Sequence, residues 1–308
     1  NALLAAMQAV SVATGLRPVW RSLAGAVAAV ASSSRPSTVS AEDLGDASHE
    51  FDARWILREH SVTGGPPIEL LESRFVFVDG AGAHVWPASR CLASYLWRGG
   101  PGTERSDARE RSETPQSPWH GCKVLELGCG CGYLAIVLAR WGAKVLATDG
   151  NAGVLALADA NTVLHNKSES LQLQFRALDW TDLATCAQLH KDAGPFDAII
   201  ISDGVLVAPP SGPMWHKVGD AEHMVSLPGP LLDATRLLGH PNTEVILAVV
   251  DRAGDVQETA RALLDRRHWL DIVGFPHDLL ADEGSTKVTI FHFRWKNRPN
   301  VGSEVTQK

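Results

Sequence analysis

From residue 123 onward, short apolar runs alternate along the chain with segments long enough to form helices. Continuous apolar runs of this length are typical of parallel strands, because helices bury such strands on both faces of a sheet. The alternation therefore predicts an α/β fold. The predicted strands are "KVLEL" (123–127), "KVLATD" (144–149), "LQLQFRALDW" (171–180), "FDAIIISD" (196–203), "EVILAVVD" (244–251), "LDIVGF" (270–275) and "TKVTIFHFRW" (286–295).

The last two apolar runs follow one another without a helix-length segment between them. A parallel crossover needs a longer connection, so we expect the last strand to pair antiparallel, at or near an edge of the sheet. The predicted helices cover residues 133–142, 152–166, 230–239 and 255–269. Together these elements predict a Rossmann-like, doubly wound sheet of seven strands that is mostly parallel and has an antiparallel last strand.

Changes in composition divide the chain into five segments. We expect residues 1–45 to be disordered or transit-like, and residues 46–97 to form an N-terminal extension that packs on the core. Glycine, proline and charged residues crowd into 98–118, which predicts a flexible loop. The core itself is predicted to cover 119–296, and the remaining 297–308 to form a disordered tail.

The N-terminal segment contains Arg17, Arg21 and Arg35 but no acidic residue before Glu42, and is rich in alanine, serine and valine. This is the composition of a transit segment that directs a protein to a mitochondrion or plastid. A disordered tail on a cytoplasmic protein explains the composition equally well. Because arginines and a proline interrupt the apolar stretch, we expect no membrane span.

The net charge of −7 over 308 residues argues against a nucleic-acid partner, since such proteins normally carry a basic surplus or a basic stripe. The five cysteines show no CxxC pair, and the twelve histidines show no HxxxH spacing with a carboxylate. Neither a disulfide framework nor a metal site is predicted. We expect reduced, mostly buried thiols and a monomeric chain.

A glycine-rich turn joins the first predicted strand to the first predicted helix. In "ELGCGCGY" the residues Gly128, Gly130 and Gly132 follow Glu126. Glycine lets a chain turn sharply and lets a ligand approach the backbone, because it has no Cβ atom. A dinucleotide-binding turn needs the spacing GxGxxG, and Tyr133 stands where its third glycine belongs. The turn therefore predicts a ligand without a pyrophosphate, and disfavours a nicotinamide-dependent oxidoreductase.

Acidic residues follow three other predicted strands, at the edge where open sheets of this kind bind ligands. Asp149 can accept hydrogen bonds from both hydroxyls of a ribose, or it can cap the next helix. Asp179 can accept from the exocyclic amine of adenine beside Trp180, or the two can be a turn aspartate and a core tryptophan. Asp203 ends a strand that we expect beside the strand of the glycine turn, at the mouth of the cleft.

Several segments together resemble the class I S-adenosylmethionine-dependent methyltransferases. They are "HVWPASRCLASYLW", "VLELGCGCGYLAIVLARWGAKVLATDGN", "LDW" and "FDAIIISD". More narrowly, "VWPAS" followed by "LELGCG" and "LDW" is similar to the seven-strand protein lysine methyltransferases, whose members act on calmodulin, chaperones and elongation factors. The resemblance covers roughly residues 70–296. It implies S-adenosylmethionine as the cofactor and a lysine of a protein substrate as the methyl acceptor.

The resemblance also implies roles by position. The glutamate and glycines of the turn would line the methionine end of the cofactor, Asp149 would hold the ribose, and the aspartate–tryptophan pair would hold the adenine. Trp86 would pack near the cofactor, although a tryptophan before proline is often only a core anchor. The predicted cofactor-binding residues are Trp86, Glu126, Gly128, Gly130, Gly132, Asp149, Asp179 and Trp180.

Asp203 is the predicted catalytic residue, as a carboxylate that orients the acceptor amine. The family usually places Tyr or Phe three positions after this acid, whereas this chain has Leu206. Trp215 could supply an aromatic ring from another direction, or it could be an ordinary loop tryptophan. The departure at Leu206 leaves two alternatives open. One is another acceptor, namely protein histidine, protein arginine or a small metabolite, and the other is a catalytically silent binding module.

Overall fold

The computed structural model describes residues 55–74, 81–99, 117–165, 171–206, 227–252, 254–280 and 286–296. The predicted terminal segments 1–45 and 297–308, most of the predicted loop 98–118, and Trp215 lie outside the described residues. In the part of the chain that is described, none of the helices has the length and apolar character that a bilayer span requires.

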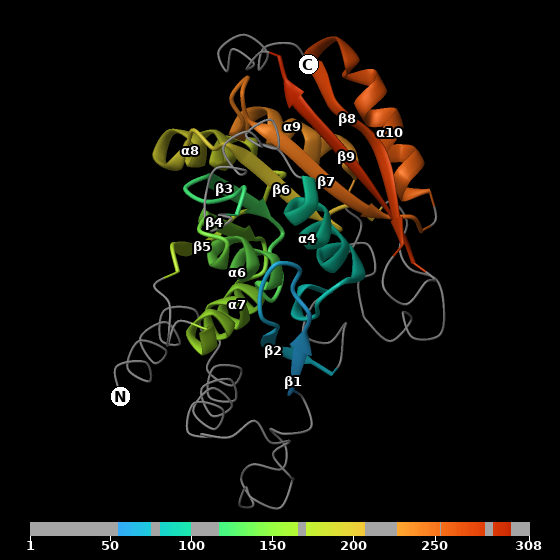
Figure 1. Ribbon diagram of the computed structural model, residues 1–308. Helices are drawn as coiled ribbons and strands as arrows, with labels where there is room; N and C mark the ends of the chain where they lie inside the picture. Colours follow the sequence, from blue (N-terminus) through green and yellow to red (C-terminus); the bar gives the residue numbers. More distant parts are fainter. Residues whose placement is uncertain are drawn as a thin grey trace, which may run out of the picture.

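A single seven-stranded sheet runs through the centre of the described structure (Figure 1). Its strands are β3 (Lys123–Leu127), β4 (Lys144–Asp149), β5 (Leu173–Ala177), β6 (Ala198–Ser202), β7 (Glu244–Val250), β8 (Leu270–Leu280) and β9 (Lys287–Trp295). The order across the sheet is β5-β4-β3-β6-β7-β9-β8. Strands β3 to β7 are parallel, and β9 pairs antiparallel with both β7 and β8. The predicted antiparallel last strand is therefore confirmed, one place in from the edge.

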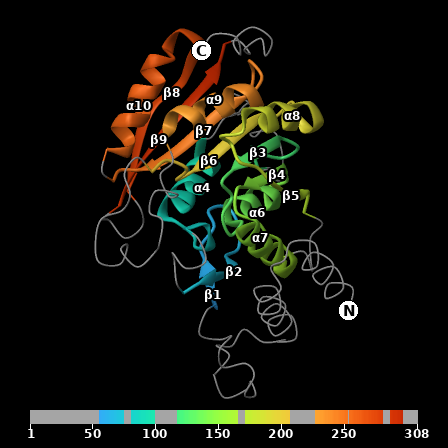
Figure 2. The ribbon, with the colours of Figure 1, turned by 180° about the vertical axis from the view of Figure 1, so that it is seen from behind.

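Helices cover both faces of the sheet, as the two opposite views in Figures 1 and 2 show. They are α4 (Pro87–Gly99), α6 (Tyr133–Arg140), α7 (Ala152–His165), α8 (Leu183–Ala193), α9 (Pro228–Leu238) and α10 (Asp255–Asp265). Helices α4, α6 and α7 pack on one face, and α8, α9 and α10 on the other. Helix α8 is missing from the sequence prediction. Its buried side is narrow, consisting of Cys186, Ala187 and Leu189, so the helical period is weak there.

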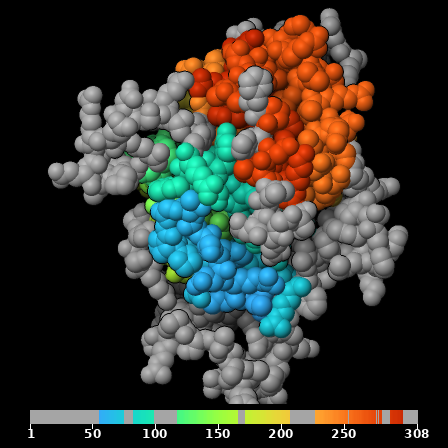
Figure 3. Space-filling view, turned by 45° about the vertical axis from the view of Figure 1, so that its right-hand side comes forward, coloured from blue at the N-terminus to red at the C-terminus, as the bar shows by residue number. Residues whose placement is uncertain are grey.

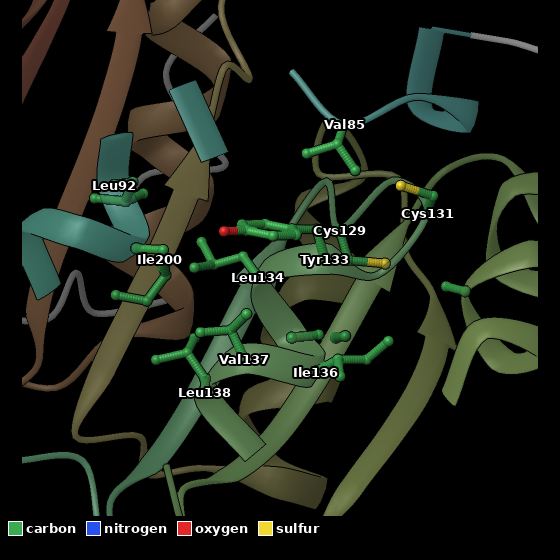
Figure 4. Packing of buried hydrophobic residues seen from close by; sticks show 14 of the residues in the cluster. Val85, Leu92, Cys129, Cys131, Tyr133, Leu134, Ile136, Val137, Leu138 and Ile200 are labelled. Atoms are coloured by element: carbon green, nitrogen blue, oxygen red, sulfur yellow. The ribbon is translucent and has the colours of Figure 1, made fainter. Parts of the chain in front are cut away.

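Residues along the strands alternate between two apolar cores. On β3, Val124 belongs to the core under α4, α6 and α7, whereas Leu125 belongs to the core under α8, α9 and α10. Figure 4 shows part of the first core, where Leu134 of α6 and Leu92 of α4 come together with Ile200 of β6. Because both faces are buried, the carboxyl edge of the parallel strands is the part of the sheet left for a ligand.

A two-stranded antiparallel hairpin precedes the central sheet and consists of β1 (Trp55–His60) and β2 (Ile68–Ser73). Strand β2 packs against α7. A short 3-10 helix, Ala81–Ala83, then leads into α4. In Figure 3 the hairpin (blue) and α4 (teal) lie together on one face, with the red C-terminal strands above them. The hairpin thus lies over the C-terminal half of α7, where Leu71 contacts Asn161 and Glu69 contacts His165.

Candidate active site

The glycine-rich turn lies between the end of β3 and the start of α6. Gly128, Gly130 and Gly132 have φ angles of 73°, 54° and 90°, in the left-handed region that glycine adopts without steric cost. The backbone N–H of Gly128 donates to the carbonyl oxygen of Thr148 at 2.8 Å, which holds the turn against β4. A Cβ atom on Gly130 would lie 2.9 Å from the carbonyl oxygen of Gly82. Only glycine therefore lets the 3-10 helix that contains Gly82 approach the turn this closely.

Asp149 ends β4 and faces the turn. One carboxylate oxygen accepts from the backbone N–H of Gly130 at 3.1 Å, and the other accepts from Asn151 N–H at 2.9 Å. Burial raises the pKa of Asp149, although the backbone hydrogen bonds oppose that rise. A carboxylate offers about four lone-pair directions, so two donors leave room for two more. Asp149 can therefore hold the turn in place and still accept hydrogen bonds from a ligand.

Glu126, the fourth residue of β3, is 2% exposed. Its Oε2 atom has no hydrogen-bond partner among the described residues. Burial, followed by the nearby charge of Asp149, raises the pKa of Glu126 well above its usual value. An unsatisfied buried acceptor costs about 1–3 kcal/mol, and more when it is charged. A ligand that brings a cationic donor to this end of β3 would remove that cost.

Trp180 and Asp179 follow β5, and their side chains make different contacts. A Cβ atom on Gly128 would lie 3.3 Å from Cζ3 of Trp180, so the indole ring lies against the glycine turn. Asp179 is exposed, and its Oδ1 accepts from both the backbone N–H and the hydroxyl of Thr181, at 2.8 and 2.7 Å. Trp180 is thus brought to the site, whereas one oxygen of Asp179 closes a local turn.

Asp203 follows β6, beside the strand of the glycine turn, and is paired with an arginine. Its two carboxylate oxygens accept from Nη1 and Nη2 of Arg252 at 2.9 and 2.5 Å, and its side chain is 4% exposed. The Arg252 guanidinium also lies 5.5 Å from the ring centroid of Trp86. The predicted catalytic acid and the predicted N-terminal tryptophan therefore meet through Arg252. Leu206, three residues after Asp203, is partly buried.

A buried charged cluster fixes the segment that precedes Trp86. Glu72 of β2 is fully buried, and its Oε1 lies 2.6 Å from Nε2 of His60. Its Oε2 accepts from the backbone N–H of Val85 at 2.9 Å and lies 2.6 Å from Nδ1 of His84. No described group of three or more histidine, cysteine, aspartate and glutamate side chains has an arrangement that would hold a metal ion. Because Glu72 contacts β1 and the residues just before Trp86, we interpret the cluster as a structural anchor.

Asn161 of α7 connects the hairpin to the glycine turn. Its side chain accepts from the N–H of Leu71 at 2.8 Å and donates to the carbonyl oxygens of Leu71 and Cys131, at 3.1 and 2.9 Å. Tyr133, which replaces the dinucleotide glycine, is buried and donates to the carbonyl oxygen of Ser61 at 3.2 Å. Figure 4 shows Tyr133 beside Cys129 and Leu134, at the start of α6. The hairpin is thus part of the wall of the site.

Three of the residues that build this site, Glu72, Asn161 and Arg252, are absent from the sequence prediction. Arg252 comes two residues after the end of β7, the fifth parallel strand, so a search just beyond every strand end would have found it. Glu72 and Asn161 carry no such signal, because their partners lie 12 to 90 residues away along the chain.

Comparison with known proteins agrees with the fold and the turn. Residues 69–210 match a family model described as lysine methyltransferase. This matched range makes up less than half of the 308-residue chain, and it is similar to the class I S-adenosylmethionine-dependent methyltransferases. The resemblance seen in the sequence is confirmed at this level. Of the predicted site residues, the matched range contains all the cofactor residues and Asp203, but it ends before Arg252.

Curated relatives match the chain over shorter stretches. A protein-L-isoaspartate O-methyltransferase of Methylorubrum extorquens is 37% identical over 82 residues, which are 27% of this chain and 32% of that protein. A ubiquinone biosynthesis O-methyltransferase of Caulobacter sp. is 31% identical over 97 residues, 31% of this chain and 34% of that protein. The chain therefore spans about a third of the length of these relatives.

Solved structures with a similar fold include a SAM-dependent methyltransferase from Agrobacterium tumefaciens. It is 19% identical, with a TM-score of 0.47, and the match covers 78% of this chain and 70% of that one. A 16S rRNA N2 G1207 methyltransferase of T. thermophilus, in complex with AdoMet and guanosine, is 18% identical with a TM-score of 0.47. That match covers 79% of this chain and 51% of the other chain.

S-adenosylmethionine is the cofactor of class I methyltransferases, and the described residues fit it. The unpartnered buried oxygen of Glu126 suits the ammonium of a methionine moiety. Asp149 retains acceptor capacity at the end of the next strand, where a ribose binds in open sheets. Trp180 lies against the turn and offers an aromatic surface, which suits a base. The described residues thus offer an acceptor or a surface for each part of the cofactor.

Proposed function

We propose that the protein transfers a methyl group from S-adenosylmethionine to the side-chain amine of a lysine in a protein substrate. The observation that carries the proposal is the buried, unpartnered oxygen of Glu126 beside a left-handed glycine turn. The description of the matching family model supports lysine as the acceptor. The proposal includes the predicted roles of Glu126, Asp149 and Trp180 toward the cofactor, of Asp203 toward the acceptor, and a monomeric protein without a nucleic-acid partner.

S-adenosylmethionine, when bound, supplies a methyl group activated by a sulfonium. The acceptor must then offer a free electron pair, because the new bond forms in line with the bond that breaks. A lysine with an ordinary pKa of about 10.4 pays about 4.6 kcal/mol to be neutral at pH 7. The protein can lower the remaining barrier by holding the amine in line and by keeping water away.

In this proposal Asp203 accepts a hydrogen bond from the acceptor amine and so fixes the direction of its electron pair. Both Asp203 oxygens are already bound by Arg252. Each oxygen retains a second lone pair, so Asp203 can still accept from an amine. The carboxylate thus orients the amine, and the proton of a charged lysine leaves through solvent. Trp86, on the other side of Arg252, would form an apolar wall for the lysine side chain.

The test is to incubate the protein with deuterium-labelled S-adenosylmethionine and a lysate of cells that lack it, and to identify labelled molecules by mass spectrometry. A labelled protein lysine supports the proposal. A label on a carboxyl group, on histidine, on arginine or on a small molecule would show that this group, and not lysine, is the methyl acceptor. Cofactor binding without any label supports the silent binding module.

Two aspartate variants provide the matched controls for this test. Asp149→Ala removes a carboxylate from the proposed cofactor site, so we expect at least a tenfold weaker affinity for S-adenosylhomocysteine and a loss of labelling. Asp265→Ala removes an exposed carboxylate from the end of α10, on the layer that packs on α9, and should change neither. Calorimetric titration and the labelling assay check both expectations. Unchanged affinity and unchanged labelling in Asp149→Ala would contradict the proposed role of Asp149 toward the cofactor.

A further inference from the structure

Three segments that lie far apart in the sequence meet at the carboxyl edge of β6 and β7. Trp86 precedes α4, Asp203 follows β6, and Arg252 follows β7. The hydroxyls of Ser89 in α4 and Ser202 in β6 are hydrogen bonded at 2.9 Å, which places the start of α4 at this edge. The strand of the glycine turn is the next neighbour of β6 in the sheet. The three residues therefore lie beside the proposed cofactor site, on the side of β6.

Arg252 makes directed contacts on several sides. Its fork holds both oxygens of Asp203, its guanidinium carbon lies 5.5 Å from the ring centroid of Trp86, and its Nη1 lies 3.6 Å from Oδ2 of Asp255. Burial lowers the pKa of Arg252, but the hydrogen bonds and charges of Asp203 and Asp255 outweigh burial and raise it. A bidentate pair of this kind fixes the plane of the carboxylate as well as its position.

The backbone of Asp203 shows why its side chain needs to be held. Its φ angle is 57°, in the left-handed region, and Asp203 is the one residue other than glycine with a positive φ in the described part of the chain. Residues in this region persist where surrounding contacts fix them, and they gather at functional sites. The contacts here are the Arg252 fork and the hydrogen bond from Asp203 N–H to the carbonyl oxygen of Ala248 at 2.8 Å.

We propose that Arg252 is a positioning residue that aims the Asp203 carboxylate at the acceptor amine and sets Trp86 beside it. This inference rests on the proposed function, since it assumes an amine acceptor. Two carboxylates against one guanidinium leave a net negative charge at the edge, which favours a cationic or amine acceptor over an acidic one. Arg252 also donates a hydrogen bond to each Asp203 oxygen, which makes Asp203 a weaker base. Asp203 therefore selects and orients the acceptor amine, and the proton of the amine leaves through solvent.

The inference can be tested without knowing the natural substrate. Sinefungin resembles S-adenosylmethionine but carries a primary amine in place of the sulfonium methyl, so its amine reports on the acceptor side. S-adenosylhomocysteine lacks any group there and reports on the cofactor side alone. Calorimetric titration with both ligands gives two dissociation constants for each variant. Their ratio is the dissociation constant of sinefungin divided by that of S-adenosylhomocysteine. A general loss of stability changes both constants and leaves the ratio unchanged.

We expect Arg252→Met to weaken sinefungin binding at least fivefold while S-adenosylhomocysteine binding stays within twofold. Arg252→Lys keeps the charge but loses the fork, and should fall between the wild type and Arg252→Met. Arg266→Met is the matched control, because Arg266 forms a similar pair with Asp233 between α10 and α9. An unchanged ratio in Arg252→Met, or equal loss for both ligands, would overturn the positioning role.

The labelling experiment separates this inference from the proposed function. Labelled lysine together with an unchanged ligand ratio in Arg252→Met overturns the role of Arg252 and leaves the proposed function standing. A labelled group other than an amine overturns the proposed function. In that case a fivefold change in the ratio still supports Arg252 as the residue that positions Asp203, although toward a different acceptor. Asp203→Asn should raise the ratio as far as Arg252→Met does, since both variants act through the same carboxylate.

Discussion

Replacing Glu72 by glutamine tests whether the buried charged cluster of the hairpin stabilises the fold. Glu72 has no exposed surface and contacts His60, His84 and the backbone N–H of Val85. Burial on its own raises the pKa of Glu72, but the hydrogen bonds from the two histidines and Val85 together outweigh it and lower the pKa from 4.5 to about 2. The ionised carboxylate is therefore favoured by folding.

The lowering of the pKa sets both the size and the pH range of the effect. A change from 4.5 to about 2 corresponds to about 3 kcal/mol of stability for the ionised form. This stability is fully present above the unfolded pKa and is lost as pH falls from about 4.5 to about 2, where the folded protein also binds the proton. Glutamine keeps the shape of the side chain without the charge. Glu72→Gln should thus lower the free energy of unfolding by about 3 kcal/mol at pH 7.

Urea unfolding of the wild type and Glu72→Gln, at several pH values between 7 and 3, measures this difference. Below pH 4.5 the difference should shrink, because the wild type loses what the variant already lacks. Glu69→Gln, an exposed glutamate on the same strand, is the control and should stay within about 0.5 kcal/mol of the wild type. Equal stabilities at pH 7, or a difference that does not change between pH 6 and pH 3, would refute the reasoning.

Two further variants test the cofactor side of the site. Gly130→Ala places a Cβ atom 2.9 Å from the carbonyl oxygen of Gly82 at a φ of 54°, so we expect at least tenfold weaker binding of S-adenosylhomocysteine by calorimetry. Unchanged affinity would show that the turn can shift to accommodate the added Cβ atom. Glu126→Gln should weaken the same binding about tenfold but raise the melting temperature of the ligand-free protein. The folded state of the wild type binds a proton more tightly at Glu126 than the unfolded state does, so its stability falls as pH rises. A lower melting temperature for Glu126→Gln at pH 8 would contradict this account.

The sheet and the ligand edge could be predicted because their signals are local. An apolar run predicts a buried strand wherever it stands in the sequence. Ligands of open sheets bind at the carboxyl ends of the parallel strands, so Glu126, Asp149 and Asp203 are expected near one another. The structure confirms that β4 and β6 flank β3, so the three acids lie at the carboxyl ends of adjacent strands. The glycine spacing needed no knowledge of tertiary structure either, since positive φ angles are a property of the turn itself.

The pairing of charges could not be predicted in the same way. Glu72 stands in "IELLES", where nothing separates it from the exposed Glu69, and only the folded hairpin brings His60 and Val85 against it. Asp203 was expected to face an amine directly, and the structure adds Arg252, which lies 49 residues further along the chain. Contacts of this kind depend on how two strands and a loop meet, and no periodicity in the sequence records them.

Asn161 recognises only main-chain atoms of Leu71 and Cys131, although it links the hairpin to the cofactor turn. A link made through the peptide backbone does not depend on which side chains stand at positions 71 and 131. The link therefore places no demand on the side chains at those two positions, which only their packing in the core constrains, while position 161 must keep a side-chain amide with a donor at one end and an acceptor at the other. Other residues of the hairpin can change without breaking its link to the cofactor turn, as long as Asn161 is kept.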